Sequence, residues 1–257
     1  MVDQLDRLQY RGGRVSTTKE GRTTRSATMI VTAKQNNENS RTYALRILKQ
    51  NLVSLDLEPG SLLSEKDLAV EMGLSRTPVR EALIELDRVG IVQILPQKGT
   101  QVSLIDYALV EEARFIRLAL EKEVVKILAT SEKPEMFAVL DEIVQLQDLY
   151  LSLKNPTKLL ELDDVFHATL FGIANKANSY AWLTEGMNIH FDRVRKMSLE
   201  TVKDMKIVED HRAIVEALRQ GDGSLAQNLV EKHLSRYKID EDAIRAAYPA
   251  YFINGEE

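Results

Sequence analysis

From about position 39, apolar side chains recur at steps of three and four residues, which is the spacing of one face of an α-helix. The recurring positions are Tyr43, Ile47, Leu48, Leu52 and Leu55. The stretch Glu58-Pro59-Gly60 then interrupts the pattern, and proline and glycine are strong helix breakers. The pattern therefore predicts a first helix that begins near Asn39 and Ser40 and ends before residue 58.

The next segment predicts two short helices joined by a tight turn. Ser64 precedes the first helix as an N-cap, and Gly73 follows it at the position where a left-handed glycine ends many helices. Ser75 precedes the second helix as an N-cap, and Gly90 follows its end. Pro78 fits the first turn, where backbone amides have no partner within the helix.

A hairpin is predicted after the second helix. Two runs of β-forming residues, 91–95 and 100–104, flank Pro-Gln-Lys-Gly. Val79, Leu83 and Leu86 supply the buried stripe of the preceding helix. Residues 39–104 are thus predicted to form a winged helix-turn-helix domain.

From Asp106 onwards the pattern is helical and shows no convincing strand. Prolines and the Gly-Asp-Gly stretch at 221–223 divide it. The predicted helices cover residues 106–130, 133–153, 156–175, 178–199, 202–220 and 222–247. We therefore expect a mainly α protein whose residues 105–248 form an all-α antiparallel helical bundle, followed by a tail over 249–257.

Residues 1–38 have no sustained apolar period and are rich in Arg, Thr, Ser, Gly and Asn. We expect a disordered basic leader, because such a segment buries too little apolar surface to fold. Residues 1–40 hold seven Lys/Arg and four Asp/Glu. The leader is either a loose extension or a basic arm that touches DNA phosphates, and Met29 is an alternative start.

The net charge of -5 is unevenly distributed, which matters more than its sign. Residues 41–105 hold eight Lys/Arg and eight Asp/Glu, whereas residues 106–257 hold nineteen and twenty-seven. The acidic part is therefore the helical domain. The placement of single cations within 62–104 sets the potential that DNA would meet.

Composition excludes several classes of protein. The chain has no cysteine, so disulfides, thiolate metal sites and cysteine nucleophiles are excluded. No apolar run approaches the ~20 residues of a membrane span, and the N-terminus lacks an apolar signal core. We expect a cytoplasmic protein without membrane contact.

The helix that begins after Ser75 has the side chains of a DNA-recognition helix. Arg76 and Arg80 stand four residues apart and share one face. Such a helix enters the major groove by its N-terminal end, where arginine pairs with guanine through two hydrogen bonds. Thr77 can contact a phosphate or a thymine methyl group. A solvated helix pair that binds no DNA would show the same periodicity.

Two further cations flank this helix. Lys66 lies on the preceding helix and Lys98 at the tip of the wing, where they can reach phosphates or the minor groove.

The run SEKDLAVEMGLSRTPVREALIELDRVGIV followed by KGTQV resembles the winged helix-turn-helix of the GntR family of bacterial transcription regulators. The resemblance extends over residues 41–104 and implies that Lys66, Arg76, Arg80 and Gly99 contact operator DNA. The family often has arginine where this chain has Lys66, so paired hydrogen bonds to a base are not implied there.

All four histidines lie in the helical domain. Asp163 and His167 are four residues apart and leave one face of one helix, whereas His211 and His233 lie on later helices. Three imidazoles and one carboxylate suit a divalent metal such as Zn²⁺ or Ni²⁺. Spacing alone also fits a histidine in an ordinary core.

Residues 106–240 resemble the FCD domain of the FadR subfamily. The matching stretches are Phe115–Glu121, Asp163–His167, Glu209–Ile214 and His233-Leu234. The resemblance implies that Asp163, His167, His211 and His233 hold a divalent cation, with Asp164 as the alternative carboxylate.

Two more residues are candidates for effector binding. Arg117 matches an arginine that faces the cavity in the family and can clamp a carboxylate, although it can equally anchor Glu121, four residues on. His190 either lines the same cavity or is a surface or core histidine.

Together the two resemblances imply a homodimeric transcription regulator, by default a repressor. It would read a pseudo-palindromic operator and respond to a small carboxylate bound at the metal. The alternative is a metal-dependent hydrolase or lyase that acts on a small organic acid, with Glu209 or Asp210 as general base.

Overall fold

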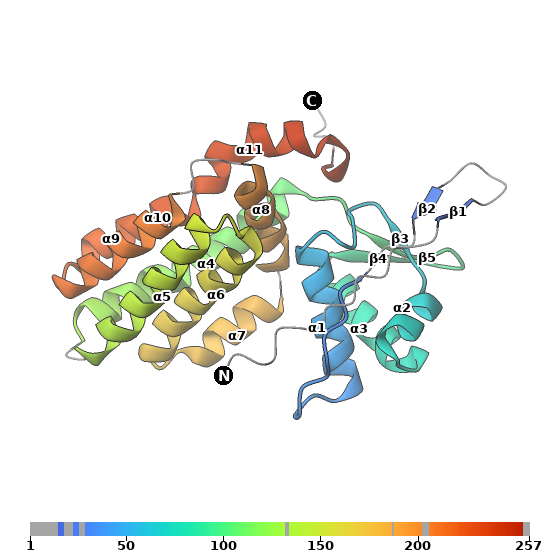
Figure 1. The fold of residues 1–257 in the computed structure, drawn as a ribbon, viewed down its shortest axis with the longest axis horizontal. Helices are drawn as coiled ribbons and strands as arrows, with labels where there is room; N and C mark the ends of the chain where they lie inside the picture. Colours follow the sequence, from blue (N-terminus) through green and yellow to red (C-terminus); the bar gives the residue numbers. More distant parts are fainter. Residues whose placement is uncertain are drawn as a thin grey trace. The chain divides into compact units, whose positions relative to one another are not determined.

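The computed structural model describes residues 15–17, 23–25, 29–131, 134–186, 188–201 and 206–253 (Figure 1). The chain forms two compact units. The first extends to Asp87 and includes Val92–Val102, and the second comprises Arg88–Ile91 and the chain from Ser103 onwards.

The first unit has the predicted order of two short helices and a wing, preceded by a longer helix. Its helices are α1 (Ser40–Val53), α2 (Glu65–Met72) and α3 (Arg76–Arg88). Strands β3 (Leu62–Leu63), β4 (Val92–Leu95) and β5 (Gly99–Val102) form an antiparallel sheet in the order β3-β5-β4. The short strand β3 is an addition that the sequence pattern did not predict.

Two glycines carry local geometry that other residues tolerate poorly. Gly73 ends α2 with φ 65° and ψ 33°, the left-handed conformation predicted for it. Gly99 begins β5 with φ 107°, and a Cβ atom there would lie 2.9 Å from the Leu63 carbonyl oxygen. Gly99 is therefore required by the fold of the wing, whatever its role toward DNA.

The predicted disorder of residues 1–38 is wrong for part of that segment. Strands β1 (Val15–Thr17) and β2 (Thr23–Arg25) pair antiparallel, and residues 29–38 pack on α1. The buried side chain of Asn51 explains this packing, because it accepts a hydrogen bond from the Ile30 amide and donates one to the Ile30 carbonyl. The rest of residues 1–38 lies outside the described part of the chain.

The second unit is helical. Figure 1 shows the first four helices of this unit and α9 and α10 as a bundle. Its helices are α4 (Tyr107–Ala129), α5 (Glu135–Ser152), α6 (Pro156–Ile173), α7 (Ala177–Glu185), α8 (Asn188–Thr201), α9 (Ile207–Arg219), α10 (Gly223–Leu234) and α11 (Arg236–Ala247). The mainly α fold class is confirmed.

Two predicted helices are each divided in two. Gly186, with φ -108° and ψ -123°, separates α7 from α8 within the predicted 178–199. Ser235, with ψ 0°, separates α10 from α11 within 222–247. Both breaks interrupt continuous helical periodicity, so the apolar pattern did not reveal them.

The predicted C-terminal tail is ordered up to residue 253. Pro249–Tyr251 form a 3-10 helix, and Phe252 pairs with Ile105 in a parallel bridge. Phe252 is buried and stacks on Tyr107, with 5.3 Å between ring centroids. The segment thus fixes the residues that lead into α4.

In the described residues, no helix combines the length and the apolar character that crossing a bilayer requires.

Candidate functional site

The N-terminal half of α3 presents two unpaired cations. Arg76 and Arg80 are exposed and make no ion pair within the described chain. Two arginines of α1 differ, because Arg41 pairs with Glu85 and Arg46 with Glu38, both at 2.5 Å. An arginine without an acidic partner remains available for phosphate or a base edge.

The other predicted DNA contacts lie on the surface of the same unit. Thr77 is exposed beside the two arginines, Lys66 is exposed on α2, and Lys98 is exposed in the turn between β4 and β5. Ser75 precedes α3, but its hydroxyl makes no hydrogen bond among the described residues, so the expected cap is absent.

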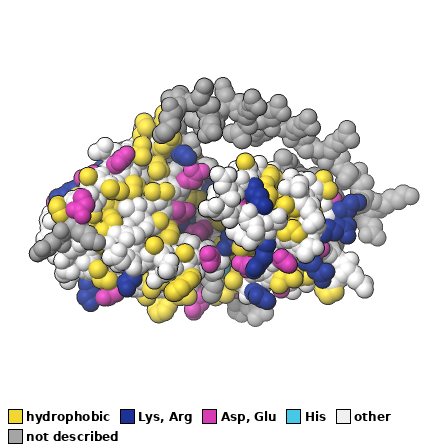
Figure 2. Space-filling view, turned by 90° about the horizontal axis from the view of Figure 1, so that it is seen from below, with side chains coloured by type: hydrophobic (Ala, Val, Ile, Leu, Met, Phe, Trp, Pro, Cys, Tyr) yellow, Lys and Arg dark blue, Asp and Glu magenta, His cyan; other side chains and the backbone are white. Residues whose placement is uncertain are grey.

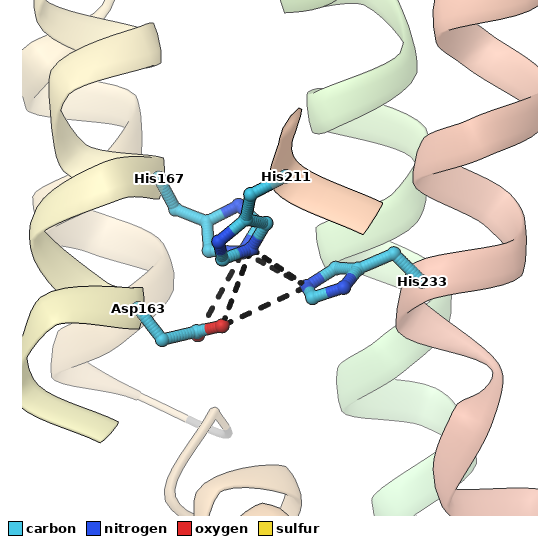
Figure 3. Close-up of side chains that lie close together, drawn as sticks. All are labelled: Asp163, His167, His211 and His233. Atoms are coloured by element: carbon cyan, nitrogen blue, oxygen red, sulfur yellow. Dashed lines mark hydrogen bonds and ion pairs between the residues drawn. The ribbon is translucent and has the colours of Figure 1, made fainter. Parts of the chain in front are cut away.

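Four predicted metal ligands converge inside the helical unit. Asp163 and His167 extend from α6, His211 from α9 and His233 from α10, and Figure 3 shows them pointing toward one another. Their ligand atoms all lie within 4.8 Å of one another. All four side chains are buried, and no histidine is visible on the face in Figure 2.

The distances between these atoms fit a common ion. The Nε2 atom of His233 lies 3.2 Å from that of His167 and 3.3 Å from that of His211. Asp163 Oδ1 lies 3.4 Å from His211 Nε2 and 3.8 Å from His233 Nε2. Two atoms each about 2.1 Å from one metal ion lie roughly 2.9–3.4 Å apart for angles between 90° and tetrahedral. Three of these distances match that spacing, and the Asp163–His233 distance exceeds it. His167 Nε2 lies 3.7 Å from the other Asp163 oxygen, Oδ2, so the set is wider than a bound metal requires.

Each histidine also has an oxygen near its other ring nitrogen. His167 Nδ1 lies 2.9 Å from Glu121 Oε2, and His211 Nδ1 lies 2.9 Å from Gln147 Oε1. His233 Nδ1 faces Asp210 Oδ2 at 3.7 Å. Among the described residues only the His211–Gln147 contact is a hydrogen bond, and it favours the proton on His211 Nδ1 and leaves Nε2 of that ring as the ligand atom.

Sequence reasoning missed Glu121, Gln147 and Asp210 as supports of the metal ligands. They lie on α4, α5 and α9, and only the fold brings them to the histidine rings.

Electrostatics in the cluster favour neutral imidazoles and an ionised carboxylate. Burial lowers the pKa of His167, and burial together with His233 lowers the pKa of His211 well below its usual value. Burial would raise the pKa of Asp163, but Arg195 and the three histidines outweigh it and lower that pKa. Neutral imidazole and ionised carboxylate are the forms that bind metals.

Arg195 of α8 holds the second oxygen of the central carboxylate. Its Nη2 atom donates to Asp163 Oδ2 and, at 3.0 Å, to Asp164 Oδ1. Asp163 Oδ1 has no hydrogen-bond partner and faces the histidines. Asp164, the alternative ligand in the sequence, is half exposed and lies outside the group of four.

The two predicted effector residues differ in their surroundings. Arg117 is buried and pairs with Glu121 at 2.6 Å, while its Nη1 and Nη2 atoms make no hydrogen bond among the described residues. His190 does not line the cavity beside the cluster. Its Nε2 atom instead lies 2.8 Å from the Val89 carbonyl oxygen, so it is a core histidine with a structural partner.

The first unit exposes a recognition helix beside a wing, and the second holds a buried cluster of possible metal ligands. This combination defines a two-domain DNA-binding regulator. Residues 42–102 match the bacterial regulatory proteins of the gntR family, and residues 112–236 match the FCD domain. The chain therefore belongs to the GntR family of transcription regulators, as a member with an FCD domain.

Relatives along most of the chain are regulators. An HTH-type transcriptional regulator of Streptomyces ambofaciens is 35% identical over 222 residues, which is 86% of this chain and 92% of that protein. The HTH-type transcriptional repressor RspR of Escherichia coli K12 is 34% identical over 209 residues, 80% of this chain and 91% of that protein. Both relatives are named as transcription regulators, which gives no support to the hydrolase or lyase alternative.

A solved structure shares the fold. Escherichia coli McbR/YncC superposes with a TM-score of 0.69 at 20% identity, over 82% of this chain and 99% of that one.

Proposed function

We propose that this regulator is a repressor whose operator affinity is controlled by a small carboxylate bound at a divalent metal, zinc or nickel. Asp163, His167, His211 and His233 would hold the metal. Arg76 and Arg80 would read base edges, supported by Thr77 and by further contacts from Ser75, Lys66, Lys98 and Gly99. The repressor RspR is the similar protein that supports this sign of regulation.

One observation carries the metal proposal: the Nε2 atom of His233 lies 3.2 Å from that of His167 and 3.3 Å from that of His211, inside the core. When these nitrogens are unprotonated their lone pairs repel one another, and a cation between them turns the repulsion into three bonds. An ordinary buried histidine needs only one or two hydrogen bonds, so this convergence favours a metal site.

The surrounding charges give independent support. A network of ion pairs beside the histidines contains two arginines and four carboxylates: Arg117, Arg195, Glu121, Asp163, Asp164 and Asp192. Burial opposes ionisation of Glu121, but His167 and Arg117 outweigh it and bring its pKa to about 2. With all six groups ionised the network carries a charge of -2, which one divalent ion with three neutral imidazoles would balance.

When bound, the metal supplies a Lewis-acidic centre to which a carboxylate can coordinate. Arg117 is buried nearby, and its Nη2 atom, which makes no hydrogen bond among the described residues, would add a donor for the same anion. An effector would alter DNA binding by favouring one conformation over another, because a ligand shifts an equilibrium only by its differential affinity.

We further propose a homodimer that binds a pseudo-palindromic operator, since operator symmetry mirrors protein symmetry. Helix α5 supports this proposal with an exposed apolar stripe at alternating steps of three and four residues, broken only by Glu142. The stripe comprises Val139, Leu146, Leu149 and Leu153.

Elemental analysis of the purified full chain tests the metal site. We expect about one divalent ion per chain, lost in His211→Ala. A metal-free protein whose melting temperature no divalent ion raises would refute the proposal. Operator binding, measured with and without metal, separately tests regulation.

A further inference from the structure

A cavity of about 390 Å³ lies beside the metal cluster, within the helical unit. Asp163 and His233 form part of its wall, so a ligand in it would reach the metal site directly. A volume of about 390 Å³ lies within the range of about 300–1,000 Å³ typical of small-molecule sites, so the cavity has room for a ligand larger than acetate.

Much of the remaining wall is apolar. It includes the side chains of Phe191, Leu199, Ile207, Leu234 and Ile239. Ile239 is 80% exposed, so the cavity opens to solvent on the side of α11. An apolar group placed against these side chains would leave water, which stabilises the complex.

The polar side chains of the wall are already engaged within the protein. Arg195 binds three carboxylates, and Arg236 donates to both oxygens of Asp210. The Ser198 hydroxyl donates to Asp240, which also lines the cavity.

The two remaining polar residues of the wall have partners as well. The Tyr237 hydroxyl donates to Glu111, and Lys206 also interacts with another group of the protein. A ligand rich in hydroxyl groups would therefore find few donors or acceptors on the described wall, and each unpaired hydroxyl would weaken its binding.

From these observations we infer that the effector is an amphipathic monocarboxylic acid with an aliphatic or aromatic body larger than that of acetate. Its carboxylate lies at the Asp163–His233 part of the wall, and its body lies against Leu199, Ile207 and Ile239. Sugar acids and dicarboxylates are disfavoured, because the polar side chains of the described wall already bind other groups of the protein. The inference rests on the proposed function, since it names the ligand of the same site.

Calorimetric titration of the full chain loaded with one zinc ion tests this inference. The probes are acetate, butanoate, hexanoate and octanoate, compared with gluconate and succinate. Each additional buried methylene group should raise the affinity about fourfold. Hexanoate should therefore bind more tightly than gluconate and succinate. Equal affinity across the series, or tighter binding of gluconate or succinate, would overturn the inference.

A pair of variants tests whether the aliphatic body of the acid lies against the assigned wall. Ile239→Ser removes an apolar wall residue that is mostly exposed, so the fold should tolerate it. It should reduce octanoate affinity several-fold and leave acetate affinity unchanged. Ile127→Ser, on a partly exposed isoleucine that does not line the cavity, is the matched control. Equal losses in both variants would contradict the assigned wall.

Repeating the series on protein stripped of metal separates the two proposals. Affinity should fall for every acid, while the ratio between octanoate and hexanoate, which differ by two methylene groups, stays at ~16-fold. If no metal binds but this ratio persists, the metal proposal fails and the ligand class stands. If metal binds but octanoate and hexanoate bind equally tightly, the ligand class fails and the metal proposal stands.

Discussion

Replacing Gln147 tests whether the histidine tautomers are set for a metal. Gln147 is fully buried on α5, its Oε1 atom accepts from His211 Nδ1 at 2.9 Å, and its Nε2 atom donates to the Leu162 carbonyl at 3.0 Å. Gln147→Met keeps the approximate volume but removes the acceptor. Without that acceptor the His211 ring can take the other tautomer or rotate.

Loss of such a support typically lowers metal affinity 10–100-fold, which corresponds to about 1.4–2.7 kcal/mol. Competition with a chelator of known affinity at pH 7.5 measures the change. Gln147→Glu retains an acceptor and should stay within a few-fold of wild type. Gln145→Leu, on the exposed face of the same helix, is the control. Wild-type affinity in a folded Gln147→Met protein would refute the reasoning.

Three further predictions concern other parts of the chain. Arg76→Ala and Arg80→Ala should each weaken specific operator binding about 5–150-fold in a mobility-shift assay while the circular dichroism spectrum is unchanged; intact binding would exclude α3 as the reading helix. Gly99→Ala should destabilise the first unit by roughly 1–3 kcal/mol in urea unfolding, because of its φ of 107° and the close backbone contact. Gly73→Ala, whose Cβ would meet nothing within 4 Å, should cost less. Burial lowers the pKa of His190 below the ordinary ~6.5 of an unfolded chain, so the unfolded chain takes up this proton more readily. The free energy of unfolding should therefore decline as the pH falls below ~6.5. His190→Gln should make this decline smaller in metal-free protein.

The sequence predicted the elements that local chemistry specifies. Ser64 and Gly73 mark both ends of α2 because a side-chain oxygen and a left-handed glycine act within one turn of the chain. The i, i+4 spacing of Asp163 and His167 likewise places both side chains on one helix face, whatever the rest of the fold. Such features need no knowledge of tertiary packing.

Features that depend on tertiary packing were missed. Gln147 is an ordinary residue type, and only the packing of α5 against α9 places it on His211. For His190 the sequence left a cavity position and a core position open, and the fold places its ring against the Val89 carbonyl. The order of residues 29–38 depends on the buried Asn51, whose partner lies twenty-one positions away.

Helix α8 carries buried cations that bind several other parts of the helical unit. Arg193 is fully buried without a carboxylate partner among the described residues, and burial lowers its pKa to about 10. Its Nη1 atom donates to the Ser103 carbonyl at 2.9 Å, and Nη2 lies 3.4 Å from His190 Nδ1. A buried charge that loses such partners becomes strongly destabilising, so α8 cannot separate from Ser103 at low cost. Since Arg195 of the same helix holds Asp163, α8 contacts both the central carboxylate of the cluster and the segment that follows β5.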